Sequence, residues 1–338
     1  MIYPKFLKEK DVIGVTAPSE GCSNDEIDIN SFSNAIEEFK KRGITIKETP
    51  NCRTCNLGRS SSAEVRAKEF ESLFNNNEVG AVLAYSGGEF LIEMLPYVNF
   101  DVIKNNPKWV QGFSDPTGLL FPITTNLDIA TIYSNNLRKF TMSPWHKSLE
   151  DNLSILKGNL IKQTSYDKYQ NERIEKVTGL EPYNLDSKVK WKNITGEKEI
   201  TLHGRMLGGC IDILASLVGT KFDNTVNFIE KYKEDGIIWF FDNCDFTNEQ
   251  LLRVLWQLKN ANWFKYAKGF IFGRSGNDVS AFNVSFEDSV KEVLQDLNVP
   301  IITDADISHK PPCMTIINGA IADIKSKDGK GTIEFELK

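Results

Sequence analysis

The chain has 338 residues, of which 41% are hydrophobic and 25% are charged, and these ordinary globular proportions exclude a disordered, collagenous or fibrous protein. Because single hydrophobic cores stop growing at roughly 250–300 residues, the length predicts two domains. The net charge of -6 comes from 46 acidic and 40 basic residues spread along the chain, so no concentrated basic face indicates nucleic acid as a partner.

The first twenty residues carry charges at Lys5, Lys8, Glu9, Lys10 and Asp11. These charges leave no apolar run of signal-peptide length. The longest apolar runs, such as 237–241, have the length of a strand and not of a membrane span. We therefore expect a soluble, cytoplasmic protein without a membrane partner.

The first 160 residues alternate between short β-rich runs and amphipathic runs. Strands are predicted at DVIGVTAP and GITIKETP, and the helical spacing of SFSNAIEEFKKRG between them ends at Gly43, a typical C-cap. A second helix opened by Ser62 follows, then a third strand, EVGAVLAYSGG, and a fourth strand with a turn and a helix start, PKWVQGFSDPTGLLFPI. This α/β alternation predicts a Rossmann- or flavodoxin-like parallel sheet over 1–160, with ligands at the carboxyl ends of its strands.

Residues 161–200 are polar and lack periodicity, so we expect a connector or an excursion there. After it, EITLHGRML predicts a strand, GGCIDILASLVGT a turn and a helix, GIIWFFD a buried strand, and TNEQLLRVLWQLKNANWF an amphipathic helix. Further strands are predicted at KGFIFGR, VPIITDA and TIEFELK. Residues 201–338 should therefore form a smaller, mixed α/β C-terminal domain.

Ser114 follows the predicted fourth strand, in the turn Gly112-Phe113-Ser114-Asp115-Pro116. A serine at such a turn projects its hydroxyl from the edge of the sheet, and the amides after it face a developing oxyanion. The G-x-S-x-G pattern is incomplete, because Pro116 replaces the second glycine. The alternative is a serine that caps the following helix.

A nucleophilic serine needs a base, and histidine is the usual one. His203 lies within an alternating strand, where a structural role is expected, and His146 lies in a turn beside Trp145. His309 lies in an irregular loop just beyond the strand VPIITDA, where a side chain can reach across a cleft. Its position favours His309 over His146.

The third member of a triad is a carboxylate that orients the imidazole. Asp242 ends the apolar strand IIWFF, at the sheet edge where catalytic residues occur, whereas Asp245 and Glu249 belong to the start of the next helix. Two glycine pairs complete the set of candidates: Gly87-Gly88 could offer an amide to an oxyanion or phosphate, and Gly208-Gly209 precede a helix. Neither pair has the spacing of a nucleotide-binding loop.

The six cysteines are scattered, at a density far below that of a disulfide-stapled domain, and are expected to be reduced thiols. Cys52 and Cys55 have the C-x-x-C spacing of half a zinc site or of a redox pair. No second such pair and no nearby histidine completes a site, so the spacing favours ordinary thiols.

Four segments of the chain resemble, in order and spacing, the LD-carboxypeptidase family, which includes muramoyl-tetrapeptide carboxypeptidases and microcin C self-immunity peptidases. They are LKEKDVIGVTAPS, AVLAYSGGEFLIEMLPYVNFDVIKNNPKWVQGFSDPTGLL, GRMLGGCIDILASLVGT and HKPPCMTIINGA. The resemblance implies a serine of the N-terminal domain, an acid and a histidine of the C-terminal domain, no metal or other cofactor, and usually a homodimer.

Carried over by position, the resemblance implies Ser114 as nucleophile, His309 as base, and the amides of Gly88 and Asp115 as the oxyanion hole. The family's glutamate falls on Asp242, which is shorter by one methylene, and the triad chemistry also works with aspartate. Arg205 and Arg274 are possible partners for a substrate's terminal carboxylate.

The expected reaction is hydrolysis of an amide next to a C-terminal residue. The bond is either the L,D-peptide bond of a murein tetrapeptide or that of a microcin C-like aminoacyl or peptidyl nucleotide, whose base an aromatic residue of 161–200 could stack on. A non-catalytic binding protein for peptides or nucleotides is the alternative, because aspartate replaces the family's glutamate. A Rossmann-type dehydrogenase is excluded by the missing glycine fingerprint.

Overall fold

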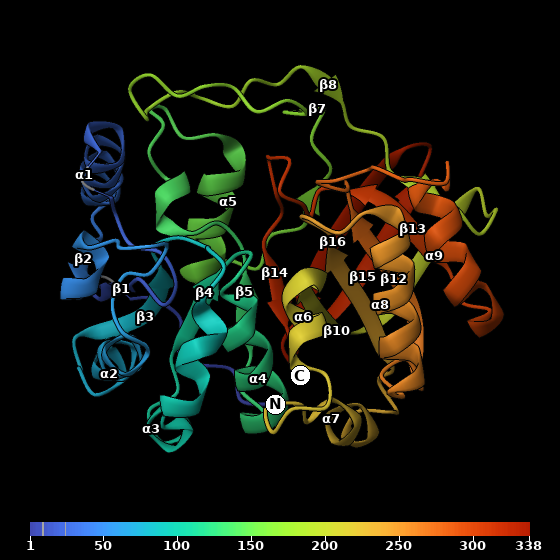
Figure 1. Ribbon diagram of the computed structural model, residues 1–338, viewed down its shortest axis with the longest axis horizontal. Coiled ribbons are helices and arrows are strands. Elements are labelled where there is room, and N and C mark those ends of the chain that lie inside the picture. The colour runs from blue at the N-terminus through green and yellow to red at the C-terminus, as the bar shows by residue number, and fades with distance from the viewer. Residues whose placement is uncertain (9, 24) are drawn as a thin grey trace. The chain divides into compact units, whose positions relative to one another are not determined.

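A computed structural model describes residues 1–8, 10–23 and 25–338 (Figure 1). The chain divides into two compact units, and each is described by itself. Unit 1 comprises Met1–Asn159 and Arg173–Tyr183, and unit 2 comprises Leu160–Glu172 and Asn184–Lys338. Residues 161–200, expected as an excursion, are thus shared between the two units.

Unit 1 is built on a parallel sheet with the strand order β2-β1-β3-β4-β5. Its strands are β1 (Val12–Thr16), β2 (Thr45–Glu48), β3 (Val79–Ala84), β4 (Trp109–Gly112) and β5 (Thr131–Tyr133). The order is that of a flavodoxin-like fold, and the central strands β3 and β4 are buried because helices cover both faces of the sheet. This confirms the predicted α/β class and parallel N-terminal sheet.

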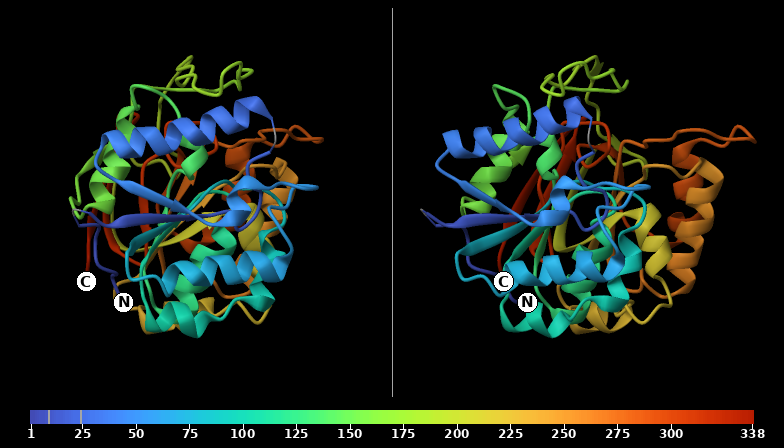
Figure 2. Two further views of the ribbon diagram at one scale, coloured as in Figure 1. Left: turned by 90° about the vertical axis from the view of Figure 1, so that its left-hand side faces the viewer. Right: turned by 60° about the vertical axis from the view of Figure 1, so that its left-hand side comes forward.

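Helices flank this sheet, with α1 on one face and α2 on the other (Figure 2). The α-helices of unit 1 are α1 (Glu26–Lys41), α2 (Ala63–Phe74), α3 (Phe100–Asn105), α4 (Thr117–Leu127) and α5 (Lys147–Leu156), and short 3-10 helices include η1 (Pro50–Arg53), η2 (Leu91–Tyr97) and η3 (Leu137–Lys139). Ser62 caps α2 as predicted, by accepting a hydrogen bond from the Val65 amide. The prediction that the first helix begins at Ser31 is wrong, because the Asp25 carboxylate caps the Ile27 amide and starts α1 at Glu26.

Unit 2 contains an eight-stranded mixed sheet in the order β6-β16-β15-β10-β11-β12-β13-β9. Strands β10 (Glu199–Cys210), β11 (Ile237–Asp242), β12 (Ala267–Gly273) and β13 (Ile301–Ala305) run parallel in its centre. Antiparallel strands extend it on both sides: β6 (Gln163–Thr164), β9 (Lys192–Asn193), β15 (Ile321–Lys327) and β16 (Lys330–Glu336). This confirms the mixed C-terminal domain. The remaining strands are β7 (Lys168–Tyr169) and β8 (Ser187–Lys188), which pair with each other, and β14 (Ile316–Asn318).

The helices of unit 2 are α6 (Ile211–Leu217), α7 (Thr225–Lys231), α8 (Asn248–Asn260), α9 (Phe286–Leu294) and the short η4 (Gln295–Leu297). Helices α8 and α9 pack side by side (Figure 1). The predicted turn at Gly208-Gly209 is wrong, because both residues continue β10 beside β11. A Cβ at Gly208 would lie only 1.8 Å from the Phe240 carbonyl oxygen, so glycine permits the close approach of the strands.

Among the described residues, no helix is both long and apolar enough to cross a membrane.

Candidate active site

The turn between β4 and α4 holds Ser114 in an unusual backbone conformation. Ser114 has a φ of 68°, in the left-handed region, where a non-glycine residue costs on the order of 1–3 kcal/mol. Its carbonyl accepts a hydrogen bond from the Thr117 amide at 2.9 Å, which closes the turn. Helix α4 has Pro116 at its N-cap, so the interpretation of Ser114 as a helix cap is wrong. A strained strand-to-helix turn is the backbone that presents a nucleophilic serine.

Gly112 explains why proline can stand where G-x-S-x-G has a second glycine. A Cβ at Gly112 would lie 2.4 Å from the Cβ of Pro116, closer than real Cβ atoms approach. Gly112, the first glycine of the pattern, therefore leaves the space that Pro116 occupies, and a second glycine is not needed.

Asn136 holds the same turn from the side of β5. Its Oδ1 accepts a hydrogen bond from the Phe113 amide at 2.9 Å, and its Nδ2 donates to the Phe113 carbonyl at 3.0 Å. One buried amide side chain thus fixes both polar backbone groups of the residue before Ser114. No motif in the sequence predicts this role of Asn136, and only its position in the loop just beyond β5 could have suggested it.

The glycine pair after β3 lies against Ser114. A Cβ at Gly87 would be 3.2 Å from the Ser114 Cβ and 3.4 Å from its Oγ. Gly88 has a φ of 144°, a conformation that side chains rarely adopt. Because β3 and β4 are neighbours in a parallel sheet, their carboxyl ends bring the glycines and the serine together as predicted.

Asp115 is fully buried, although its amide is the second predicted oxyanion donor. Its Oδ2 accepts hydrogen bonds from the Ser19 hydroxyl at 2.5 Å and from the Leu91 amide at 3.0 Å. Burial raises the pKa of this carboxyl to about 6. The side chain therefore ties the serine turn to the loops after β1 and β3.

The predicted acid and base lie together in unit 2. Asp242 ends β11, His309 lies in the loop after β13, and Oδ2 of Asp242 is 2.9 Å from Nδ1 of His309. The other carboxylate oxygen accepts a hydrogen bond from the His309 backbone amide at 3.3 Å. Asp242 is fully buried, whereas 13% of the His309 side chain is exposed. The aspartate is thus long enough to reach both the imidazole and the backbone of this loop.

The two rival carboxylates have other surroundings. Glu249 accepts hydrogen bonds from the Ser280 hydroxyl at 2.5 Å and from the Ala281 amide at 3.0 Å. The Ser280 hydrogen bond is the main reason that the pKa of Glu249 is lowered to about 2. Asp245 follows in the loop after β11, where its amide donates to Asp212. The geometry favours Asp242 as the partner of His309.

The other histidines also have local partners. His146 is the N-cap of α5, where its Nδ1 accepts a hydrogen bond from the Ser148 amide at 3.1 Å. His203 lies on the exposed side of β10, with Nδ1 2.9 Å from Oδ1 of Asp323. Both arrangements are explained by the local fold.

Arg205 and Arg274 are 2% and 3% exposed, and both are ion-paired. Arg205 bonds Asp235 at 2.5 Å. Arg274 bonds Asp306 at 2.8 Å and donates to the Lys310 carbonyl at 3.0 Å, so it supports the loop that carries His309. Both guanidinium groups thus act within the fold, and neither is disposed to bind a substrate carboxylate.

The aromatic side chains of the 161–200 region are also engaged. Trp191 is buried, and its indole N–H donates to Asp306 at 3.1 Å. The Arg274 guanidinium lies 4.4 Å from the ring centre of Tyr169. Trp191 therefore supports the core of unit 2 and is not available to stack on a nucleobase.

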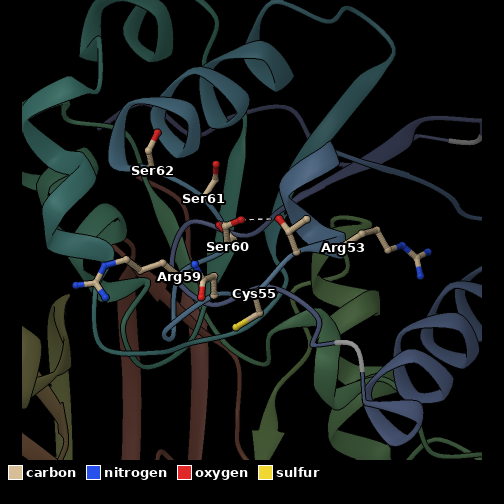
Figure 3. Close-up of a pocket in the computed structure, with 8 residues that line it drawn as sticks. Arg53, Cys55, Arg59, Ser60, Ser61 and Ser62 are labelled. Atoms are coloured by element: carbon tan, nitrogen blue, oxygen red, sulfur yellow. Dashed lines mark hydrogen bonds between the residues drawn. The ribbon is translucent and has the colours of Figure 1, made fainter.

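A pocket of about 390 Å³ opens in unit 1 beside the C-x-x-C segment (Figure 3). Its arginines point to opposite sides, where Arg53 pairs with Glu48 at 3.0 Å and Arg59 with Glu93 at 2.6 Å.

Cys52 is a free, buried thiol, and burial raises its pKa to about 12. In the described part of the chain, no group of three or more His, Cys, Asp or Glu side chains is placed to hold a metal ion.

Comparison with protein families gives matches over both units. Residues 13–134 match the LD-carboxypeptidase N-terminal domain, and residues 203–324 match the LD-carboxypeptidase C-terminal domain.

Individual relatives are distant but extend over most of the chain. The Escherichia coli microcin C7 self-immunity protein MccF is 22% identical over 85% of this chain and 83% of its own length. A Bacillus subtilis protein named "Probable murein peptide carboxypeptidase" is 23% identical over 98% of this chain and 94% of its own. The solved structure of MccF in complex with aspartyl sulfamoyl adenosine has a TM-score of 0.82 at 22% identity and covers 100% of both chains, which shows the shared fold.

Proposed function

Since this chain belongs to the LD-carboxypeptidase family, whose N- and C-terminal domains it matches, we propose that it is a serine carboxypeptidase that hydrolyses the amide bond next to a C-terminal residue. Ser114 is the nucleophile, His309 the general base and Asp242 the acid that orients it. The amides of Gly88 and Asp115 form the oxyanion hole. The observation that carries this proposal is the buried Asp242 carboxylate, 2.9 Å from the His309 imidazole.

In the first half of the reaction, Ser114 Oγ attacks the carbonyl carbon while His309 Nε2 takes the hydroxyl proton. Negative charge develops on the carbonyl oxygen and is stabilised by the two amides. The C–N bond then breaks, the leaving amine receives the proton from His309, and the remaining acyl group is an ester of Ser114. Asp242 stabilises the imidazolium that forms in between.

In the second half, water attacks the ester with His309 again as the base. The shortened product leaves as a carboxylate, and the Ser114 hydroxyl is restored. Every proton transfer in this scheme uses a residue of the triad, so the residues proposed require no metal ion. We also propose that the enzyme is a cytoplasmic homodimer, as the family resemblance implies.

Two substrate classes are supported by the relatives. The name of the Bacillus subtilis relative points to murein peptides, and the MccF complex points to aminoacyl nucleotides. Trp191 is buried and is not available to stack on a nucleotide base, so it gives no support to a nucleotide substrate. We therefore place the murein tetrapeptide first and the aminoacyl nucleotide second.

A competition assay separates these classes from each other and from simple binding. Equal concentrations of a murein tetrapeptide and of an aspartyl nucleotide are incubated with the purified protein, and products are followed by mass spectrometry. Loss of the terminal D-amino acid from the tetrapeptide is expected to be the faster reaction. Faster cleavage of the nucleotide would reverse the order, and binding without turnover of either compound would favour the non-catalytic alternative.

A further inference from the structure

The two proposed oxyanion amides belong to different loops, and the Asp115 side chain connects those loops. We propose that Asp115 is a positioning residue, whose buried carboxyl group fixes the spacing between the Gly88 and Asp115 amides. The inference rests on the proposed function, since it concerns how the oxyanion hole of that reaction is held. It assigns a role to the side chain, separate from that of the backbone amide of the same residue.

Two other segments of unit 1 donate to one carboxylate oxygen of Asp115. Oδ2 of Asp115 accepts hydrogen bonds from the hydroxyl of Ser19, in the loop after β1, and from the amide of Leu91, at the start of η2. The Ser19 oxygen also accepts a longer hydrogen bond, 3.4 Å, from the Phe90 amide. The loop that contains Gly88 is thus held at Phe90 and Leu91, two and three residues after the glycine.

Gly88 packs directly on this arrangement. A Cβ at Gly88 would lie 2.4 Å from the Ser19 Oγ, so the glycine backbone is in close contact with the hydroxyl. The loop is also joined at Gly87, whose carbonyl accepts a hydrogen bond from the Glu20 amide at 3.3 Å. A displacement of Ser19 would therefore be transmitted to Gly88.

Arg66 braces the same loops from α2. The arginine is fully buried, and its Nη1 donates to the Pro18 carbonyl at 3.0 Å and to the Phe90 carbonyl at 2.9 Å. These carbonyls belong to the residue before Ser19 and to the residue before Leu91. Arg66 thus fixes the backbone of the two partners of Asp115 and supports the same spacing.

The spacing matters because an oxyanion hole depends on geometry. Its donors must lie about 2.7–3.1 Å from the position that the oxyanion will occupy, and loss of one donor costs on the order of 10²–10³ in kcat. A misplacement of about 1 Å can cost on the order of 10²-fold in rate. Loss of a side chain that fixes the spacing of the two donors should therefore lower kcat far more than it changes KM.

Accepting these two hydrogen bonds does not require a negative charge. The amide oxygen of asparagine can accept from Ser19 and Leu91 in the same way, whereas alanine accepts from neither. If Asp115 acts by position, asparagine should restore most of what alanine loses. If it acted by its charge, asparagine and alanine would be equally defective.

The experiment compares Asp115→Ala, Asp115→Asn and Ser19→Ala with the wild type, using steady-state kinetics on the better of the two substrates. We expect kcat to fall on the order of 10²-fold in Asp115→Ala and about tenfold in Ser19→Ala, with KM changed less than about threefold. The kcat of Asp115→Asn should be at least tenfold higher than that of Asp115→Ala. Ser31→Ala is the matched control, since it also removes one buried hydroxyl hydrogen bond, to Gly179 in unit 1, and should leave kcat unchanged.

Circular dichroism and thermal melting establish which variants are folded. If Asp115→Ala does not fold, Ser19→Ala decides the question, because it removes a hydroxyl and leaves the carboxyl in place. Folded variants with kcat within twofold of the wild type, or equal defects in Asp115→Ala and Asp115→Asn, overturn the inference while the serine mechanism stands. A wild-type protein whose hydrolysis does not depend on Ser114 overturns the proposed function and this inference with it.

Discussion

The serine region of unit 1 and the acid–base region of unit 2 are built by different means. The first is made mainly of backbone: a positive φ at Ser114, the glycines after β3, and two amides. The second is a single pair of side chains, Asp242 and His309, at the carboxyl ends of parallel strands. Apart from loss of the Ser114 hydroxyl itself, we therefore expect substitutions in the serine region to act through geometry, and those at Asp242 and His309 to act through proton transfer.

The supporting residues differ in the same way. Around Ser114, side chains such as Asn136 and Asp115 bond to backbone groups and fix a turn. Beside His309, Arg274 fixes the loop after β13, while the Asp242 carboxylate lies 2.9 Å from the imidazole itself. Mutations in the two regions should therefore impair activity in different ways, which kinetic measurements can separate.

The largest effect is expected at Ser114. Ser114→Ala removes the nucleophile and should lower kcat on the order of 10⁶-fold, as loss of the serine does in serine peptidases. The fold should persist, because alanine meets the same backbone strain as serine. Steady-state assays together with circular dichroism check both statements, and near wild-type turnover would exclude a serine mechanism.

Ser114→Gly tests whether the backbone at Ser114 is strained. Glycine adopts a φ of 68° without the steric cost that serine meets. The glycine variant should be as inactive as Ser114→Ala but more stable than it, by about 1 kcal/mol. A glycine variant that melts at the same temperature or lower would show that the strain relieved does not exceed the greater entropy of glycine in the unfolded chain.

The second effect is expected at the acid. Asp242→Asn keeps the shape of the side chain but no longer stabilises the imidazolium, a change that costs on the order of 10⁴ in kcat in a serine triad. Asp245→Asn and Glu249→Gln are the controls and should keep most activity, because neither side chain is the partner of His309. Steady-state kinetics of the three purified variants measures the difference.

Asp242→Glu tests the length of the acid. The loop of His309 is held by both oxygens of the aspartate, at 2.9 and 3.3 Å, so an added methylene must displace it. We expect this variant to fall between wild type and Asp242→Asn. If Glu249→Gln abolished turnover while Asp242→Asn did not, the acid would lie on α8.

The sequence allowed the strand-end residues to be predicted, because their signals are local. An apolar strand followed by G-F-S-D-P predicts an exposed serine, and IIWFF followed by Asp242 predicts a carboxylate at a sheet edge. The pairing of Asp242 with His309 followed from the resemblance and from the position of each residue just after a predicted strand. Boundaries were less accurate, as α1 and β10 show, because a cap at Asp25 and glycines inside a strand override the periodic pattern.

The bracing residues could not be predicted from local pattern. Ser19 lies 96 positions before Asp115, and Arg66 lies 48 positions from the Pro18 carbonyl that it contacts. Such contacts depend on which loops the order of the strands brings together, and no single segment of the sequence predicts that order. The burial of Trp191 could likewise not be predicted, because the polar segment around it indicated an exposed side chain.

Gly88→Ala should give the third-largest effect and tests whether the serine region depends on backbone space. The new methyl group would lie 2.4 Å from the Ser19 oxygen, on a backbone with a φ of 144°, so the loop must shift. If the Gly88 amide is the oxyanion donor that we propose, kcat should fall on the order of 10²-fold with KM little changed. Gly43→Ala is a control for positive φ alone, because its Cβ would meet nothing within 4 Å. Full activity in Gly88→Ala would remove this loop from the oxyanion hole.

The smallest expected effect is on the pH dependence of the free energy of unfolding. Its measurement distinguishes the contribution of the Asp115 charge from that of the side chain's position. Burial raises the pKa of Asp115 to about 6 from an ordinary value of 3.8, so between these values the folded protein binds the proton that the unfolded chain releases. The wild type should therefore lose stability as the pH rises from about 4 to above 6, by at most about 3 kcal/mol at 1.36 kcal/mol per pKa unit. Asp115→Asn cannot ionise and lacks this loss.

Thermal melting of the wild type and Asp115→Asn from pH 4 to pH 8 measures the difference, in which the titration of all other groups cancels to first order. Oδ1 of Asp115 accepts no hydrogen bond from the residues that the structure describes, so an asparagine N–H₂ there would add a constant cost at every pH. The stability of Asp115→Asn relative to wild type should then rise with pH and level off above about pH 6–7. A difference independent of pH would mean that Asp115 keeps an ordinary pKa, and that its carboxylate is held as an anion by the Ser19 and Leu91 hydrogen bonds.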